Sequence, residues 1–187
     1  MKHLCTVSMM TLMVAGGVGA ADHSRSAALA EQLTLLRETL GVHAFAAENP
    51  KVPGRFVAAL FFPAQLLVIS APYSAPALLR DRIEAREYRQ VYMDLSTAGD
   101  RIDRIFVQDM GVPGLSATRK AGEPFDMTWR DGTNGIHFDG DAAAQKLSKP
   151  AYRSRFESDD AAYAELLEIL IAAITSTADV APELAQP

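Results

Sequence analysis

The sequence predicts an α+β protein in which a mainly antiparallel sheet, or a split β-barrel, is covered by N- and C-terminal helices. Apolar residues recur at helical spacing near both ends of the chain, and several short apolar runs lie between them. Neighbouring runs are mostly joined by turns that are too short for a parallel crossover. Strands that are connected in this way and flanked by helices are typical of the α+β class.

The first residues have the pattern of a cleaved signal peptide. Lys2 and His3 precede a nearly uncharged apolar run from Leu4 to Val18, and Val18-Gly19-Ala20 fits the small residues of a cleavage site. The run is shorter than the roughly 20 residues that a membrane-spanning helix needs. We therefore predict cleavage after Ala20 and a periplasmic or secreted protein, with no membrane anchor left after cleavage.

Removal of residues 1–20 from the 187-residue chain leaves enough sequence for one domain with its own core. We place this domain at residues 21–174, with a tail at 175–187 that has little to bury and is expected to fray. Cys5 is the only cysteine, so the processed chain can use neither disulfides nor thiolate chemistry. The net charge of −5 becomes −6 when Lys2 is lost, which argues against nucleic-acid and anionic-membrane partners.

The N-terminal part of the domain predicts one helix followed by strands. A helix is expected over residues 25–40, because leucines recur there at helical spacing and Gly41 follows where the helix would stop. A strand-like segment, VHAFAAENP, comes next. Two apolar runs, 55–62 and 65–70, predict buried strands, with Pro63 in their connection.

The middle of the chain predicts a second helix and two more strands. Ser74 is in a position to cap this helix, and Pro76 fits its first turn. The segments RQVYMDLS and RIDRIFVQDM then alternate in the manner of strands, and each is followed by residues typical of turns.

The segment 128–147 contains several acidic residues and glycines, and it raises the question of a metal-binding loop. Apolar residues alternate on both sides of RDGTNG, which predicts a β-hairpin with a reversal at Asp131-Gly132 or Asn134-Gly135. An EF-hand register that starts at Asp131 or at Asp139 lacks the required oxygen ligands and the final glutamate. We therefore interpret the segment as a hairpin followed by an Asp-rich helix start, with no metal site.

The C-terminal part predicts two helices. The first is short, with Ser148 as its cap, and the second begins near Ser158 and has a wide apolar stripe. A basic cluster falls in the first of these helices and just before it. Tyr152 and Phe156 are expected to pack inward while the charges are solvated, and a small anion site is the alternative interpretation. The cluster comprises Lys146, Lys149, Arg153 and Arg155.

Catalytic and metal-binding motifs are sparse. His23, His43 and His137 have no second ligand at metal-binding spacing on their own segments, and Ser116 in GLSAT does not complete a G-x-S-x-G motif. Asp94 and Asp109 lie on successive predicted strands and could approach each other as paired carboxylates. The alternative interpretation is that both lie on an exposed strand face.

Residues 66–95 form the most suggestive arrangement. A buried strand ends in a Ser/Pro turn, and a helix starts at Ser74, so backbone amides together with Ser74, Arg80 and Arg82 could hold a phosphate. The alternative is that Ser74 only caps its helix.

The order helix, two apolar strands, serine-bearing turn, short helix and tyrosine-bearing strand resembles the FMN-binding split barrel of the pyridoxamine-phosphate-oxidase-like superfamily. The resemblance covers residues 29–110 and concerns order and hydrophobicity rather than a diagnostic motif. It implies phosphate contacts from Ser74 and Arg80. The basic signature strand of the true oxidases is missing, and members of the superfamily bind FMN, haem or nothing known.

Two functional hypotheses follow. The first is an exported small-ligand-binding or accessory module without evident catalysis, whose ligand is small and anionic or carries a phosphate. The alternative is an FMN-binding split-barrel oxidoreductase in which the segment 66–95 holds the phosphate. The sequence leaves the oligomeric state open.

Overall fold

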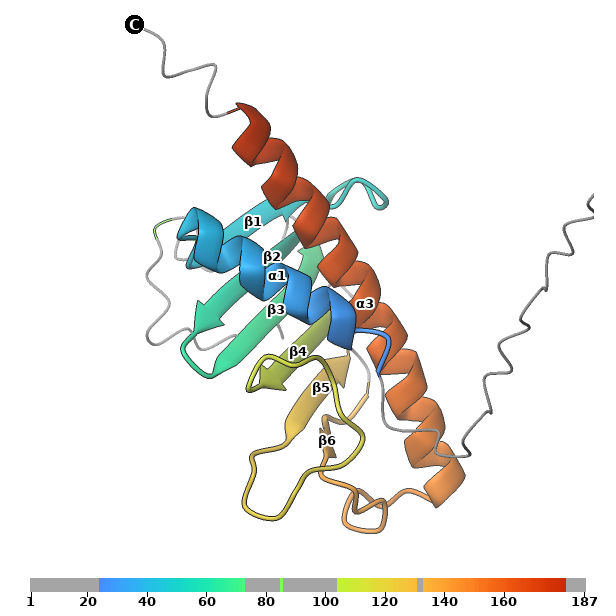
Figure 1. The fold of residues 1–187 in the computed structure, drawn as a ribbon. Helices are drawn as coiled ribbons and strands as arrows, with labels where there is room; N and C mark the ends of the chain where they lie inside the picture. The colour runs from blue at the N-terminus through green and yellow to red at the C-terminus, as the bar shows by residue number, and fades with distance from the viewer. Residues whose placement is uncertain (1–23, 73–84, 86–103, 131–132, 181–187) are drawn as a thin grey trace, which may run out of the picture.

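The computed structural model describes residues 24–72, 85, 104–130 and 133–180, with side chains described up to Ser176 in the last helix. The chain forms a six-stranded sheet. Figure 1 shows this sheet together with helices from both ends of the chain. In chain order the elements are α1 (Ala27–Leu40), β1 (Ala44–Glu48), β2 (Arg55–Phe62), β3 (Gln65–Pro72), β4 (Ile105–Met110), β5 (Asp126–Arg130), β6 (Ile136–Phe138) and α3 (Lys149–Val180).

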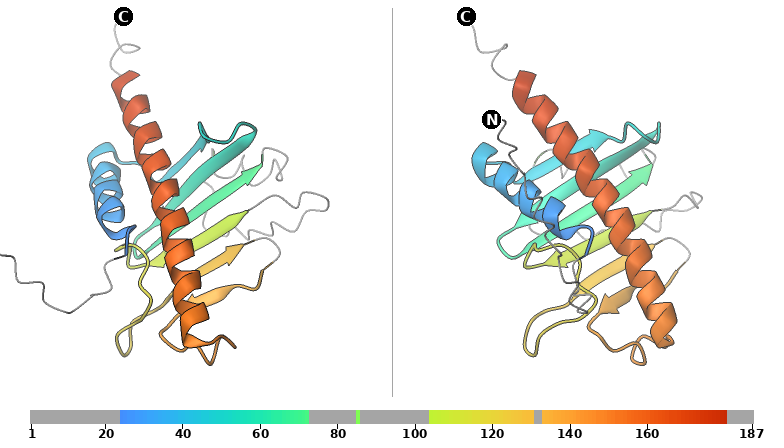
Figure 2. Two further views of the ribbon diagram at one scale, coloured as in Figure 1. Left: turned by 90° about the vertical axis from the view of Figure 1, so that its right-hand side faces the viewer. Right: turned by 45° about the vertical axis from the view of Figure 1, so that its right-hand side comes forward.

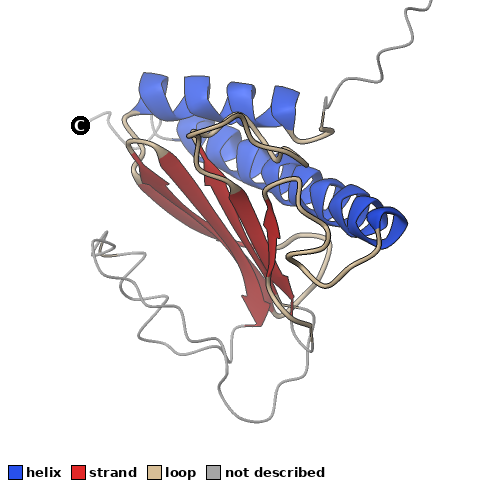
Figure 3. Ribbon diagram, turned by 90° about the horizontal axis from the view of Figure 1, so that it is seen from below, coloured by secondary structure: helices blue, strands red, loops and turns tan. Residues whose placement is uncertain are grey.

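The sheet is open and antiparallel, and its spatial order β1-β2-β3-β4-β5-β6 is the order of the sequence. The two helices lie on the same face of this sheet and pack against each other (Figures 2 and 3). The predicted α+β class, with an antiparallel sheet covered by N- and C-terminal helices, is confirmed.

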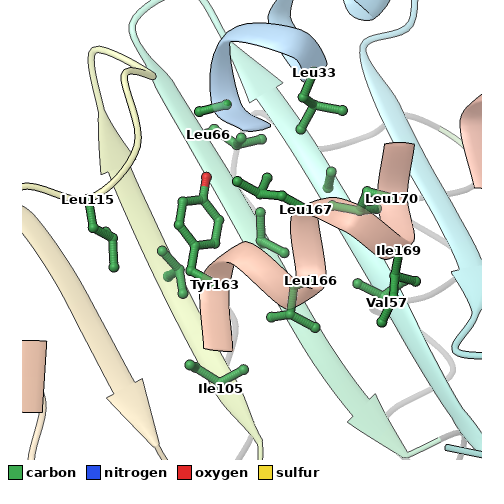
Figure 4. Close-up of a cluster of buried hydrophobic side chains, with 14 of the residues drawn as sticks. Leu33, Val57, Leu66, Ile105, Leu115, Tyr163, Leu166, Leu167, Ile169 and Leu170 are labelled. Carbon is green, nitrogen blue, oxygen red and sulfur yellow. The ribbon is translucent and has the colours of Figure 1, made fainter. Parts of the chain in front are cut away.

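The main core lies between the sheet and the helices. Leu33 of α1 and Leu167 of α3 meet Val57, Leu66 and other strand residues there, and all four side chains are fully buried (Figure 4). A second buried cluster lies on the other face of the sheet and is also apolar. It consists of Phe56, Ala58, Leu60, Leu67, Ile69 and Ala71. Burial on both faces explains why β2 and β3 are continuous apolar runs instead of alternating ones.

The predicted N-terminal elements are confirmed. Helix α1 falls within the expected range 25–40, and Gly41 ends it with φ 64°, a left-handed conformation that glycine adopts without steric cost. Strands β2 and β3 occupy the two predicted apolar runs, with Pro63 in the turn between them.

The prediction of two C-terminal helices was wrong, because α3 is one continuous helix from Lys149 to Val180. Ser148 does cap its start, accepting a hydrogen bond from the Ala151 N–H at 3.3 Å. The sequence Ser158-Asp159-Asp160 predicts a second helix start because these residues favour caps. Both carboxylates are instead bound to residues outside the helix.

The predicted hairpin is confirmed by the antiparallel pairing of β5 with β6, in which Thr128 is opposite Ile136. Asp131 and Gly132 at its tip lie outside the described residues. The apolar side chains of the two strands pack on opposite faces of the sheet. Ile136 and Phe138 belong to the main core, whereas Trp129 packs against the cluster on the opposite face.

Of the helices in the described ranges, none is sufficiently long and apolar to cross a membrane.

Candidate functional site

An open groove of about 650 Å³ runs between α1 and the loop that follows β4. The loop contributes residues 111–113, and the other described lining residues are Ser24, Ala27, Ala28, Glu31, Thr34 and Leu35. Most of these side chains are apolar, and Glu31 is the only ionisable one among the described lining residues. Leu35 is 60% exposed, so the groove has a large apolar side chain that the fold itself does not bury.

The loop that forms one wall of this groove has an unusual backbone. Gly111, Val112 and Gly114 all have positive φ, at 83°, 63° and 88°. A β-branched residue is a genuine outlier in this region, so Val112 must be held there by its surroundings. A Cβ on Gly114 would lie 2.7 Å from the backbone of Ala27, which shows how closely the loop approaches the start of α1.

Two aspartates accept hydrogen bonds from the backbone of this loop. Asp126 of β5 accepts from the N–H of Met110 and from the N–H of Ser116, each at 2.8 Å. Asp109 of β4 accepts from the N–H of Gly114 at 3.0 Å. Residues 111–113 are therefore fixed on both sides by carboxylates.

A third aspartate ties the same loop to both helices. Asp160 of α3 accepts a hydrogen bond from the Ser26 hydroxyl at 2.7 Å and also accepts from the N–H groups of Arg25 and Ser26. The Ser26 hydroxyl oxygen in turn accepts from the N–H of Leu115 at 2.9 Å. The start of α1, the loop and α3 are thus joined by one buried chain of hydrogen bonds.

Asp109 is fully buried on the face of the sheet that the helices cover. Its Oδ2 accepts from the Tyr163 hydroxyl at 3.0 Å, while Oδ1 has no hydrogen-bond partner within the described part of the chain. Burial, together with repulsion from Asp126, raises the pKa of Asp109 to about 7. Burial also raises the pKa of Asp126 to about 6. The two carboxyl groups therefore titrate far above the ordinary range for aspartate.

The carboxylate pair predicted from the sequence was Asp94 with Asp109. Asp94 lies outside the described residues, and the interpretation of Asp109 as a residue on an exposed strand face was wrong. The sequence does contain a signal for the burial of Asp109, because it falls at every second position with Ile105 and Val107, on the buried face of β4. The sequence does not predict a role for Asp126, because the apolar residues Phe125, Met127 and Trp129 indicate that the other face of β5 is the buried one.

A further aspartate, Asp159, joins α3 to the hairpin. Its carboxylate pairs with Arg130 and Arg155, each at 2.7 Å, and accepts a hydrogen bond from Thr128. Arg155 was expected to be solvated, but it is partly buried and its charge is directed at Asp159. Arg153, by contrast, is exposed and pairs with Glu157 at 2.9 Å. Both arginines thus already have carboxylate partners, which disfavours the alternative of an anion site at the basic cluster.

The remaining residues that the sequence predicts as ligands or catalytic groups do not form a binding site within the described part of the chain. Ser74, Arg80 and Arg82, the predicted phosphate ligands, lie outside the described residues, as does His23. His43 and His137 are exposed, and the Ser116 hydroxyl donates to the Thr118 carbonyl at 2.6 Å. Within the described ranges, no group of three or more His, Cys, Asp or Glu side chains could hold a metal ion.

Comparison with protein-family models, with curated proteins and with solved structures found no match.

Proposed function

We propose that this protein is an exported binding or accessory module, and that the groove between α1 and residues 111–113 holds a small apolar ligand. The observation that supports this most directly is the exposed Leu35 beside an apolar groove of about 650 Å³. Small-molecule sites are usually clefts of roughly 300–1,000 Å³ with mainly apolar walls and a few polar groups. The groove has this size and composition.

The polar groups of the groove narrow the class of ligand. Glu31 supplies a carboxylate, which accepts hydrogen bonds and attracts positive charge. The hydroxyl of Thr34 already donates to the Ala30 carbonyl at 2.9 Å, so it is available mainly as an acceptor. Both features favour a ligand with an apolar body and an amine or hydroxyl donor, and they disfavour an anionic ligand at this position.

Titration of the processed chain, residues 21–187, with the neutral apolar dye Nile red tests this proposal. Leu35→Asp should weaken the binding at least about tenfold, because it places a charge against the apolar part of the ligand. Leu40→Asp is the matched control, since Leu40 is also an exposed leucine of α1, at 42%, and is not one of the groove residues. Equal effects of the two substitutions, or no binding to the unaltered protein, would refute the assignment.

The export part of the proposal rests on residues 1–20. Mass spectrometry of the protein from the exported fraction should give an N-terminus at Ala21. A folded cytosolic protein that retains Met1 to Ala20 would contradict it.

The alternative, an FMN-binding split-barrel oxidoreductase, depends on Ser74, Arg80 and Arg82 as phosphate ligands. The carboxylate of Glu31 disfavours the FMN phosphate in the groove. The visible spectrum of the purified protein separates the two candidates. A flavin or haem absorption band would refute the first one, and a colourless protein that does not take up added FMN would refute the second.

A further inference from the structure

The groove wall formed by residues 111–113 depends on two buried carboxyl groups. Asp126 accepts from the N–H groups of Met110 and Ser116, which lie on either side of the wall, and Asp109 accepts from Gly114. The backbone between these anchors includes Val112 at φ 63°, a conformation that costs energy and persists only while its surroundings impose it.

The hydrogen bonds to Asp109 only partly offset a negative charge on it, and no cation is among the groups in the described part of the chain that shift its pKa. The titratable groups that act on it are Asp126 from β5 and Tyr163 from α3, and Asp160 of α3 adds a further negative charge near Tyr163. Facing β4 in the sheet, β3 places Leu66 opposite Asp109. Tyr163 and Gly114 both donate to Oδ2, so Oδ1 is a buried oxygen without a donor in the described part of the chain.

A buried carboxylate oxygen that lacks a donor is strongly disfavoured, whereas a carboxylic acid O–H at the same position removes the charge. Two interacting carboxyl groups also lose their protons in two separate steps. We propose that Asp109 and Asp126 retain one proton between them when the groove is formed, and that loss of this proton releases the wall at residues 111–113. Ligand binding in the groove would then weaken as the pH rises.

Movement of Asp126 would release the wall at residues 111–113. Asp126 is the less deeply buried of the two carboxyl groups, at 4% exposure against 0% for Asp109. When both are ionised, repulsion is relieved most easily by movement of Asp126 towards water. The N–H groups of Met110 and Ser116 then lose their acceptor, and Val112 can leave its strained conformation.

Amide hydrogen exchange of the unaltered processed chain tests this inference without any ligand. Protection factors, which already include the intrinsic effect of pH on exchange, should fall about tenfold or more for Met110 and Ser116 between about pH 5 and about pH 8. The Ala59 amide in the buried strand β2 exchanges through global unfolding and serves as the internal reference. Unchanged protection at Met110 and Ser116, or opening free energies at these two amides that equal the value for Ala59 at every pH, would overturn the inference.

Two variants sharpen the test. Asp109→Asn keeps an oxygen acceptor for Tyr163 and Gly114 but removes one of the two charges, so the fall in protection should disappear. Glu48→Gln removes an exposed carboxylate from β1 and should leave the fall intact. If Asp109→Asn does not fold, a pH titration of the carboxyl carbon NMR shifts of Asp109 and Asp126 in the unaltered protein tests the inference instead. Titration of both carboxyl groups in the ordinary acidic range of aspartate would overturn it.

The coupling to ligand binding rests on the proposed function, whereas the release of the wall does not. Nile red binding that weakens over the same pH range would support both. A pH-dependent loss of amide protection without dye binding would refute the proposed ligand site and leave the proton-controlled wall standing. Dye binding with constant amide protection would refute the proton-controlled wall and leave the proposed ligand site standing.

Discussion

Replacement of Asp160 by alanine should detach the start of α1 from α3. The carboxylate accepts from the Ser26 hydroxyl at 2.7 Å, from the Ser26 N–H at 3.2 Å and from the Arg25 N–H. Asp160 is only 5% exposed and Ser26 is fully buried, so water cannot easily replace the lost acceptor. Hydrogen bonds to charged groups contribute about 1.5–3 kcal/mol each, and their contributions are not additive. We expect a loss of about 3–5 kcal/mol in the free energy of unfolding.

Urea denaturation of the processed chain, followed by circular dichroism, measures this loss. Glu168→Ala is the matched control, because Glu168 also lies on α3 and pairs with Arg25, but at 3.9 Å and with both side chains well exposed. Such a surface pair should contribute less than about 1 kcal/mol. If Asp160→Ala lost less than about 1 kcal/mol, or no more than Glu168→Ala, the hydrogen bonds of Asp160 would not hold the two helices together.

Further expectations concern the loop, the hairpin and the carboxyl pair. Gly114→Ala should lower the free energy of unfolding by about 3 kcal/mol in thermal melts, because its Cβ would lie 2.7 Å from the backbone of α1. Gly122→Ala is the matched control, since it has a similar φ but no atom within 4 Å of its Cβ, and it should cost only about 1 kcal/mol. Trp129→Ala should cost about 2 kcal/mol in urea, less than a fully buried tryptophan, because the side chain is only partly buried. Calcium or a chelator should leave the melting temperature unchanged, and a rise with calcium would contradict the interpretation of residues 128–147 as a hairpin. The folded state raises the pKa of Asp109 to about 7 and that of Asp126 to about 6, so the unfolded chain loses these protons first as the pH rises. The contribution of this pair to the free energy of unfolding should therefore be fully present below about pH 4 and should fall by several kcal/mol, at most about 7, by about pH 8, at about 1.4 kcal/mol for each pH unit by which a pKa is raised. A constant or rising urea midpoint over that range would contradict this.

Much of the fold could be predicted because its signals are local. The leucine spacing before Gly41, the apolar runs of β2 and β3, and the hairpin residues all depend on neighbours within a few positions. The antiparallel pairing of β1 with β2, of β2 with β3 and of β5 with β6 follows from their short connections.

The errors arose where a side chain has a distant partner. Asp160 binds residues 134 and 135 positions away, and Thr128 reaches Asp159 across 31 positions. From the sequence alone, these aspartates are indistinguishable from helix caps. The groove was missed for a related reason, because it exists only where the loop after β4 packs on α1, with Gly114 against Ala27.

Native mass spectrometry of the purified protein tests the central claim, that the groove beside α1 binds a small apolar molecule. The processed chain should carry a bound small molecule that is released on denaturation. Leu35→Asp should abolish this adduct, and Leu40→Asp should retain it. Absence of any adduct from the unaltered protein, even after incubation with Nile red, or an adduct that survives Leu35→Asp, would contradict the account.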